Sequence, residues 1–390
     1  MRRFTVSILA TAALAAATST PAYADMSAFE VKGTQGTTLN AKPLAQFDAA
    51  WAMTFLPDGR ALVTEKTGEI WLLKKDGSKA GKISGVPAVT ARGQGGLGDI
   101  IIHPDFDKNG IVFLSYVERD AKKERLSGAV VERVKLTLGA TTGKLTNLER
   151  IWTQSPKVTG NGHYGHRLVI GPDGYLFISS GERQKFTPSQ NMSMNLGKSI
   201  RINQDGSAPE DNPFYIGDGS AADQIWTLGH RNPLGIAFDP KGRLWMQEMG
   251  PRDGDELNHI ERSKNYGYPH VSEGKHYSGV DIPDHADIPI YEAPEVAWVP
   301  AISPGGLMFY TGDVFSGWKG NAFIGGLSSQ ALIRVEFQEP PENSRRGVSA
   351  NEAERYEWDK RIREVEQGPK GAIYVLEDGD EGRLIKLTPK

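Results

Sequence analysis

The stretch LVIGPDGYLFISSG, residues 168–181, contains two short apolar runs separated by a Pro-Asp-Gly turn. Each run alternates with a period near two and is rich in β-branched, leucine and aromatic residues, which is typical of β-strands. A tight turn between two such runs predicts a pair of antiparallel strands.

The same pattern recurs along the whole chain, whereas helical periodicity is nearly missing. A turn of the Asp/Lys-Gly type precedes an apolar run at PDGRALV (57–63), DKNGIVFL (107–114), PDGYLFI (172–178), PKGRLWM (240–246), WKGNAFI (318–324) and PKGAIYV (369–375). Intervals of roughly 50–80 residues suit blade-type repeats with loop insertions. We expect an all-β, six-bladed β-propeller with four-stranded antiparallel blades around a central channel, because such a ring lets each sheet cover the next. An open sandwich would have fewer and more evenly spaced strands.

Two segments do not repeat. The first, at about 253–294, holds acidic residues and tyrosines and is predicted to be a loop insertion of the kind that often carries function. The second, QEPPENSRRGVSANEAERYEWDK (338–360), is predicted to be a solvated loop.

The N-terminus has a basic head, an apolar run and the small-residue end Ala22-Tyr23-Ala24. This pattern predicts a cleavable signal peptide at 1–24 and a periplasmic or secreted domain at 25–390. No later segment approaches the ~20 apolar residues of a membrane-spanning helix, so we expect no stable membrane insertion. The net charge of −3 gives no reason to expect nucleic acid, and the absence of cysteine excludes disulfides and thiolate metal sites.

The run GQGGLGD (93–99) contains the spacing G-x-G-x-x-G. A dinucleotide site needs a helix after this motif, and the strand-like DIIIHPDF follows instead. We therefore expect neither nicotinamide nor flavin.

Several polar groups lie where loops enter or leave the predicted strands. In a propeller these loops converge at one end of the channel, so distant residues can share a pocket. His163 is a possible proton acceptor, because imidazole titrates near neutral pH, but taken alone it could also be an ordinary surface residue. Arg231, beside Asn232, could contact a cofactor or plug the space between blades.

Two further patterns each allow two interpretations. Arg361 and Arg363 have the i, i+2 spacing that places both side chains on one face of a strand. Either an anion lies between them, or they are solvated and paired with Glu364 or Glu366. The run GPRDGDE (250–256) offers oxygen ligands suited to calcium, or it is a charged surface turn.

Taken together, these motifs resemble the soluble, pyrroloquinoline quinone (PQQ)-dependent sugar dehydrogenases, and most closely their aldose sugar dehydrogenase branch. The resemblance covers nearly the whole chain after residue 24, in one order: FLPDGRALVTEKTGEIWLL (55–73), GQGGLGDIIIHPDF (93–106), HYGHRLVIGPDG (163–174), LGHRNPLGIAFDP (228–240), EMGPRDGDELN (248–258) with NYGYP (265–269), and RIREVEQGPKGAIYVLEDG (361–379). Any one motif is weak, but six in register are specific.

The resemblance implies a role for each matched position. His163 matches the general base, and Arg231 and Asn232 match the pair that contacts the quinone, with Arg231 stabilising its negative charge. The resemblance places Gln94 and Tyr277 in the cofactor or substrate pocket, and it implies that Arg361 and Arg363 bind the PQQ carboxylates. It also implies that the carbonyls of Gly250 and Pro251 bind the calcium that holds PQQ. A second calcium is implied at Glu256 and Tyr266, with Asp255 as a neighbour.

Two positions depart from the family pattern. Ser328 stands where relatives often have a lysine directed at PQQ, so quinone affinity is lower or another cation compensates. Gly162 stands where the glucose-specific branch has an aspartate that contacts sugar, which argues against tight glucose selectivity.

The implied activity is PQQ- and calcium-dependent oxidation of aldoses at C1 to lactones, with electrons passed to an external quinone, cytochrome or dye. Two alternatives share the expected fold: a non-catalytic propeller that binds glycans or proteins, and a calcium-dependent lactonase. Fold alone does not separate them.

Overall fold

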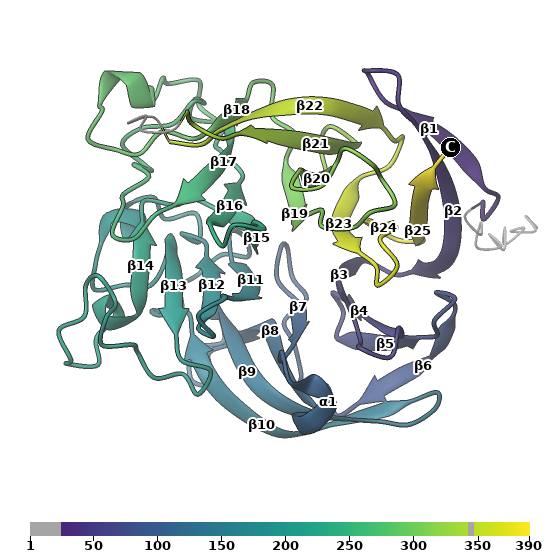
Figure 1. Cartoon of the computed structure of the whole chain (residues 1–390). Coiled ribbons are helices and arrows are strands. Elements are labelled where there is room, and N and C mark those ends of the chain that lie inside the picture. The colour runs from purple at the N-terminus through teal and green to yellow at the C-terminus, as the bar shows by residue number, and fades with distance from the viewer. Residues whose placement is uncertain (1–24, 342–346) are drawn as a thin grey trace, which may run out of the picture.

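The computed structural model describes residues 25–341 and 347–390, so the predicted signal peptide lies outside the described residues. The described chain is almost entirely β-structure, arranged as sheets around a common axis (Figure 1). Its helical elements are short: α1 Phe106–Asn109, η1 Thr187–Gln190, η2 Ala221–Gln224 and η3 His285–Asp287. Within this part of the chain, no helix combines the length and apolar character needed to cross a membrane.

The first large sheet has eight strands in the order β3-β4-β5-β6-β10-β9-β8-β7. It consists of two antiparallel four-stranded halves, joined by a short parallel pairing of Ile83 and Ser84 with Gly143 and Lys144. Its strands are β3 Ala50–Phe55, β4 Ala61–Glu65, β5 Glu69–Leu73, β6 Lys79–Ser84, β7 Leu97–Ile102, β8 Ile111–Arg119, β9 Ser127–Leu138 and β10 Gly143–Thr153.

Three four-stranded antiparallel sheets follow in chain order. They are formed by β11 Gly165–Ile170, β12 Leu176–Ser180, β13 Lys198–Ile202 and β14 Ile225–Leu228; by β15 Pro233–Phe238, β16 Leu244–Glu248, β17 Asp255–Ile260 and β18 Val296–Trp298; and by β19 Pro304–Phe309, β20 Ala322–Gly326, β21 Ala331–Gln338 and β22 Ser349–Glu357.

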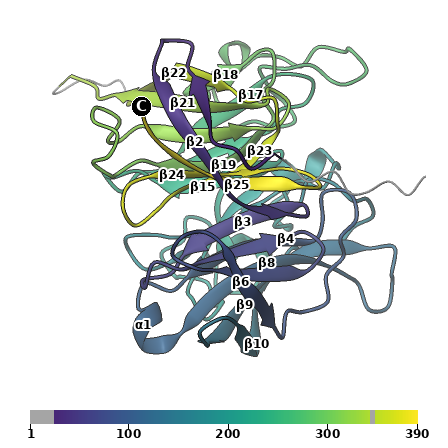
Figure 2. The same cartoon turned by 90° about the vertical axis from the view of Figure 1, so that its right-hand side faces the viewer.

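The last sheet joins the two ends of the described chain, in the order β1-β2-β25-β24-β23. Strands β2 and β25 lie side by side (Figure 2) and run antiparallel, with Leu39 paired with Pro389. The strands of this closing sheet are β1 Phe29–Lys32, β2 Thr38–Phe47, β23 Ile362–Gln367, β24 Ile373–Glu377 and β25 Gly382–Pro389. The ring is therefore closed by hydrogen bonds between residues that are far apart in the sequence.

The innermost strands of the sheets form a closed ring of contacts around the axis, in the order β3, β7, β11, β15, β19 and β23 (Figure 1). The hydrophobic core lies between neighbouring sheets. One cluster packs Phe113 and Val131 of β8 and β9 against Ile178 and Ile200 of β12 and β13, and all four side chains are fully buried. These features define a β-propeller, in which each sheet covers the next.

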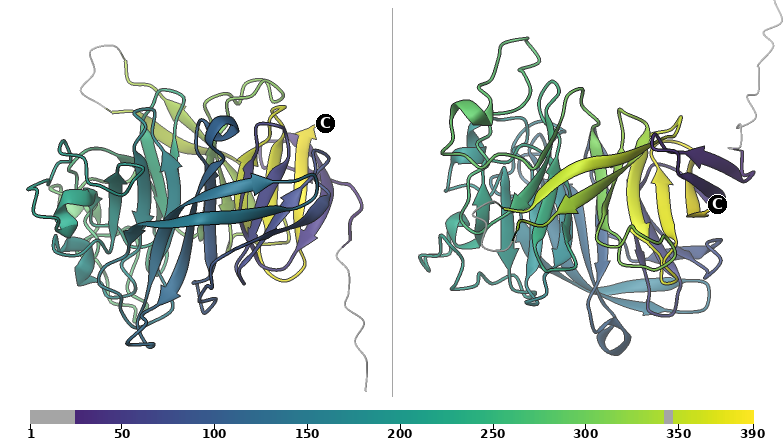
Figure 3. Two further views of the ribbon diagram at one scale, coloured as in Figure 1. Left: turned by 90° about the horizontal axis from the view of Figure 1, so that it is seen from below. Right: turned by 45° about the horizontal axis from the view of Figure 1, so that its top comes forward.

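The strand pairs and turns predicted from the sequence are confirmed, but the two non-repeating segments differ from expectation. The prediction of a solvated loop at 338–360 is wrong in part, because β22 lies within it and pairs with β21. Its charged sequence, SANEAERYE, reflects an outermost strand with much of its surface exposed. Strand β17 also occupies the start of the expected insertion, so the loop excursion runs from 261 to 295 and lies at the periphery (green in Figure 3).

Candidate functional site

Inner-strand ends and the loops beside them enclose a cavity of about 380 Å³ on the ring axis. The predicted site residues Gln94, Arg361 and Arg363 all line it, so the structure brings together three positions separated by up to 269 residues along the chain. The other lining residues are Ala49, Ala50, Trp51, Lys66, Gly93, Tyr164, Gly165, Leu234, Met249, Leu327, Asp378, Gly379 and Asp380. The cavity thus combines an apolar wall with a concentration of cations.

The arginine pair is bridged by an acidic residue that neither sequence interpretation named. Asp378 Oδ2 accepts a hydrogen bond from Arg361 Nε at 2.7 Å, and Asp378 Oδ1 accepts from Arg363 Nε and Nη2 at 3.0 and 2.9 Å. The partner is therefore neither Glu364 nor Glu366. Because the Arg361 side chain remains 48% exposed, the pair still presents positive charge to the cavity.

His163 lies beside the cavity in the segment that leads into β11. Its backbone N–H donates to Gln94 Oε1 at 2.7 Å, which ties it to a lining residue. Its Nδ1 is 2.5 Å from Glu182 Oε1. The Glu182 carboxylate also accepts backbone N–H groups of Gln184, Lys185 and Phe186.

The electrostatics of this pair assign the tautomer. Burial would raise the pKa of Glu182, but hydrogen bonds from His163 and the backbone hold that pKa below its usual value, so the carboxylate is ionised. Burial lowers the pKa of His163 by more than Glu182 raises it, and the positive charge of Arg231 lowers it further. His163 is therefore neutral near pH 7. Nδ1–H donates to Glu182, and Nε2 carries the free lone pair.

A strained backbone holds the pair in place. His163, Arg183, Gln184 and Phe186 all have positive φ, between 51° and 63°, a region that residues other than glycine rarely adopt. The buried Arg183 guanidinium compensates by binding loop carbonyls: Nε donates to Gly162 O at 2.9 Å, and the group stacks on a tyrosine ring. The rigid loop therefore fixes the imidazole before any ligand binds.

The space beside Gly162, where the resemblance places an aspartate in the glucose-specific branch, is taken by a neighbouring side chain. A Cβ atom built on Gly162 would lie 2.8 Å from Gln184 Oε1. A side chain at 162 would therefore displace the amide of the exposed Gln184.

Arg231 and Asn232 lie just before β15. The backbone N–H of Glu182 donates to Arg231 O at 2.9 Å, which joins them to the His163 pair. The Arg231 guanidinium donates to Met249 O at 2.9 Å, to Gly250 O, and to the hydroxyl of the exposed Tyr277 at 3.4 Å. Two buried atoms, Arg231 Nε and Asn232 Oδ1, have no partner among the described residues.

His163, Arg231, Asn232 and Tyr277 are not among the described residues that line the cavity itself. They form an adjoining group, connected to the cavity through Gln94 and Met249. The predicted site is therefore one assembly with two parts, which we call the base group (His163 and Glu182, with Arg231) and the cation cavity.

The predicted calcium ligands lie in and after the turn that follows β16. Asp255 shapes this turn, because its carboxylate accepts the N–H of Gly250 at 2.8 Å and of Ser303 at 2.6 Å. Burial raises the pKa of Asp255 to about 6. The carbonyl of Gly250 faces Arg231, and Pro251 is buried beside it.

Glu256 and Tyr266 lie farther from the cavity. Burial, reinforced by the negative charge of Glu248, raises the pKa of Glu256 well above its usual range. A cation beside Glu256 would stabilise the ionised carboxylate and so lower this pKa. The Tyr266 carbonyl lies 3.1 Å from Nε2 of His285. Across 25–341 and 347–390, no three His, Asp or Glu side chains converge on a metal position, so both calcium sites stay predictions.

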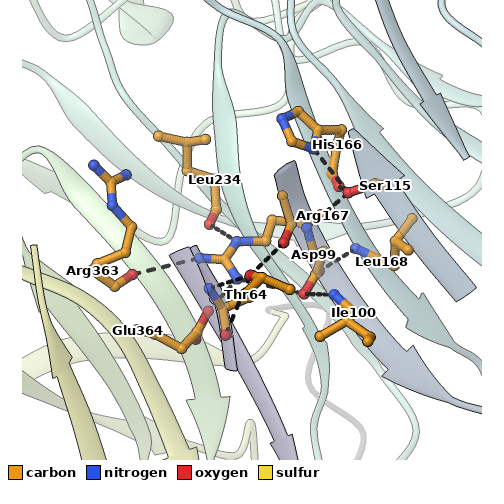
Figure 4. A network of polar contacts seen from close by, with 12 residues as sticks. Thr64, Asp99, Ile100, Ser115, His166, Arg167, Leu168, Leu234, Arg363 and Glu364 are labelled. Carbon is orange, nitrogen blue, oxygen red and sulfur yellow. Dashed lines mark hydrogen bonds and ion pairs between the residues drawn. The ribbon is translucent and has the colours of Figure 1, made fainter. Parts of the chain in front are cut away.

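A buried polar network supports the cavity from within the ring (Figure 4). Arg167 of β11 forms an ion pair with Glu364, donates to Leu234 O at 2.9 Å, and lies 4.0 Å from the centre of the Trp51 ring. Its Nη2 also reaches Arg363 O at 3.5 Å. Arg167 thus fixes several of the surfaces that line the cavity.

His166 belongs to this network and not to the base group. Its Nδ1 is 2.8 Å from Ser115 Oγ, and its ring stacks on Trp51 at 4.9 Å. Burial lowers the pKa of His166 to about 3, so it is neutral and structural. Of the two histidines in the motif HYGH, only His163 has a carboxylate partner.

Sequence reasoning missed Glu182, Asp378 and Lys66. Glu182 follows β12, and the pairing of Gly165 with Ser180 is what brings it opposite His163. Asp378 similarly follows β24, beside the start of β23. An acidic residue just past a strand that pairs with a motif strand is a signal that could have found both.

Comparisons with known proteins show which family the chain belongs to. The model of the family described as "Glucose / Sorbosone dehydrogenase" matches residues 47–386. The chain is 36% identical to the aldose sugar dehydrogenase YliI of Escherichia coli (strain K12) over 351 residues, which cover 88% of this chain and 91% of that protein.

Solved structures give the same result. The apo-form crystal structure of the soluble aldose sugar dehydrogenase from Escherichia coli matches with a TM-score of 0.81 and 35% identity, covering 90% of this chain and 100% of that one. A PQQ-bound aldose sugar dehydrogenase from Streptomyces coelicolor matches with a TM-score of 0.69 and 25% identity, covering 90% and 98%. The family match spans most of the chain, and this protein is therefore an oxidoreductase that belongs to the glucose/sorbosone dehydrogenase family.

Proposed function

We propose that this protein oxidises aldose sugars at C1 to lactones, using PQQ and calcium, and passes the electrons to an external acceptor such as a quinone, cytochrome or dye. The observation that carries the proposal is the neutral His163 imidazole, held by Glu182, next to a cation-lined cavity. A fixed base beside an anion-binding cavity suits an enzyme that removes a proton while an acidic cofactor accepts electrons.

The cation cavity fits PQQ, which is a tricarboxylic ortho-quinone. Arg361 and Arg363 supply guanidinium groups for carboxylates, while Arg231 Nε and Asn232 Oδ1 are buried polar atoms still in need of partners. When bound, PQQ supplies the two-electron acceptor for the hydride that leaves the sugar. Family membership and the PQQ-bound Streptomyces coelicolor relative support this assignment.

The chain's own residues handle the proton. His163 Nε2 accepts the proton of the anomeric hydroxyl, and the ionised Glu182 stabilises the imidazolium that forms. Arg231 supplies a fixed positive charge beside the reacting groups, which favours negative charge that develops there. The strained loop around Arg183 keeps the imidazole oriented.

For calcium, we propose the carbonyls of Gly250 and Pro251 as ligands next to the cofactor, with Asp255 positioning the turn. Glu256 and the Tyr266 carbonyl are proposed for a second, structural ion. The support is the chemistry of the oxygen donors and the burial of the Glu256 carboxyl, whose ionised form a divalent cation would stabilise.

The blade count, the location of the protein and its domain organisation complete the proposal. Counting the eight-stranded sheet as two blades gives a six-bladed propeller, supported by the short parallel contact between its halves. The sequence of residues 1–24 supports export to the periplasm or beyond. Residues 25–390 are proposed to act as one catalytic domain with its peripheral loop insertion.

Reconstitution tests the proposal directly. Purified protein is loaded with PQQ and calcium and assayed with a panel of aldoses and an artificial electron acceptor. We expect dye reduction that requires sugar, PQQ and calcium together. Lactone hydrolysis without PQQ would instead identify a calcium-dependent lactonase, and the absence of any turnover would favour a binding propeller.

A further inference from the structure

The cation cavity contains a third positive group besides the two arginines. Lys66 follows β4 and lines the same cavity as Arg361 and Arg363. Burial lowers the pKa of Lys66, and the positive charge of Arg363 lowers it further, so the two cations are close enough to repel each other.

The carboxylates nearby offset the charge of this lysine only in part, because the negative charge of Asp378 raises the pKa of Lys66 by less than burial lowers it. Both oxygens of Asp378 are engaged by the arginine pair. Asp380, at the exposed rim of the cavity, interacts with Asp48. Within the described residues, Lys66 forms no ion pair, and its Nζ donates to the carbonyl of Gly93.

The backbone keeps Lys66 at the cavity. Its N–H donates to Ala49 O at 3.0 Å, and its carbonyl accepts the N–H of Leu97 at 3.0 Å, which ties the lysine to two neighbouring inner-strand segments. Gly96, with φ of +130°, lets the chain pass closely: a Cβ atom there would lie 2.6 Å from Lys66 Cγ. Only glycine at 96 leaves room for the lysine stem.

Ser328, in contrast, does not supply a cation or line the cavity. Its side chain is exposed, and its hydroxyl donates to Ala301 O at 3.2 Å. Positive charge in the cavity is thus concentrated on the side of β4 and β23.

We infer that Lys66 is a third carboxylate-binding residue of the cavity, and that it holds an acid group of the cofactor together with Arg361 and Arg363. This inference rests on the proposed function, because it names PQQ as the ligand. An unpaired cation near two bridged guanidinium groups leaves the cavity with an excess of positive charge. A polycarboxylate relieves that excess by forming charge-assisted hydrogen bonds.

Binding, and not turnover, tests the inference. The purified protein is titrated with PQQ at fixed calcium, and occupancy is read from the intrinsic tryptophan fluorescence, to which Trp51 in the cavity contributes. We expect Lys66→Met to bind PQQ roughly ten- to a hundredfold more weakly, the range for losing one charge-assisted hydrogen bond. Its affinity should also fall less steeply with added salt than that of the wild type.

Two matched variants separate charge from packing. Lys66→Arg keeps the charge and should retain affinity within a few-fold, whereas Lys42→Met, on the exposed face of β2, should bind as the wild type does. Thermal melting of the apo-proteins checks that each variant folds.

The outcomes are distinguishable. If the wild type does not bind PQQ, both the proposed function and this inference fail. If the wild type binds but Lys66→Met binds equally well, or Lys66→Arg is weakened as much as Lys66→Met, only the role of Lys66 is overturned.

Discussion

The base group and the cation cavity adjoin each other but are built in opposite ways. In the base group, Glu182 is fully buried, both of its oxygens accept hydrogen bonds, and a strained loop fixes the imidazole. In the cation cavity, Arg361 is half exposed and one carboxylate bridges two guanidinium groups. The comparison teaches that the His163 imidazole is already fixed in the ligand-free protein. The arginines of the cation cavity, in contrast, still have room for hydrogen bonds and ion pairs to a ligand.

The largest expected effect comes from removing the base. His163→Gln should lower turnover of the reconstituted enzyme by on the order of a hundredfold or more, because the anomeric proton then has no acceptor. PQQ affinity, measured by fluorescence, should change little, since the cation cavity is intact. Near wild-type turnover in this variant would refute the assignment of His163.

A smaller loss is expected when the base stays but its partner is neutralised. Glu182→Gln should reduce turnover by roughly ten- to a hundredfold, the usual cost of removing a group that orients a histidine. The imidazole must be neutral to act, so activity falls as pH drops through the pKa of His163, which burial already holds below its ordinary value.

Because the Glu182 carboxylate raises that pKa, Glu182→Gln should move the acid limb of the pH profile to still lower pH. A pH series of kcat/KM for both proteins measures the shift. Movement of the limb to higher pH would contradict the electrostatic account.

In the cation cavity, Asp378→Asn should remove the negative charge that lies between Arg361 and Arg363. Without the bridging carboxylate, the two guanidinium groups repel each other, and the apo-protein should lose about 1–3 kcal/mol of stability in chemical denaturation, allowing for the exposure of Arg361. Saturating PQQ should restore more stability to this variant than to the wild type. Equal stabilisation of the two proteins would mean that the pair does not face the ligand.

The smallest effect is expected from Ser328→Lys. This exposed position, beside the lining residue Leu327, would present a new cation near the cavity. We expect PQQ affinity to rise by only about two- to fivefold, since an exposed and screened charge contributes little. A much larger gain would show that the cavity lacks a cation, which would weaken the role given to Lys66.

The sequence predicted the features that depend on local pattern. Strands of the sheets follow from alternation between turns, and Gln94, Arg361 and Arg363 do line one cavity. Strand β22 was missed because an outermost strand can be charged along its length, so its sequence resembles a loop. Glu256 was named as a calcium ligand, which stays a prediction, and its burial inside β17 was not foreseen.

Side-chain partners that are brought together by the pairing of strands could not be predicted from the sequence. The sequence around Glu182 (GER, 181–183) does not identify it as the partner of His163, because the contact depends on how β11 and β12 pair. Lys66 lies near Arg363 only because the last sheet returns to the first, a consequence of ring closure. Contacts that depend on strand pairing or on closure of the ring can be found only from a three-dimensional structure.

The sheet that combines β2 with β25 also governs the order in which the protein can be completed. Strand β2 is synthesised early and pairs with β1 on one edge, but its other edge has no partner until β25 has left the ribosome, so an unfinished chain carries an unpaired strand edge. A nascent molecule stalled shortly before Gly382 would be an open arc exposed to aggregation, with the walls of its cavity not yet joined. A chain that ends before β25 would therefore have most of its sheets but no closed ring.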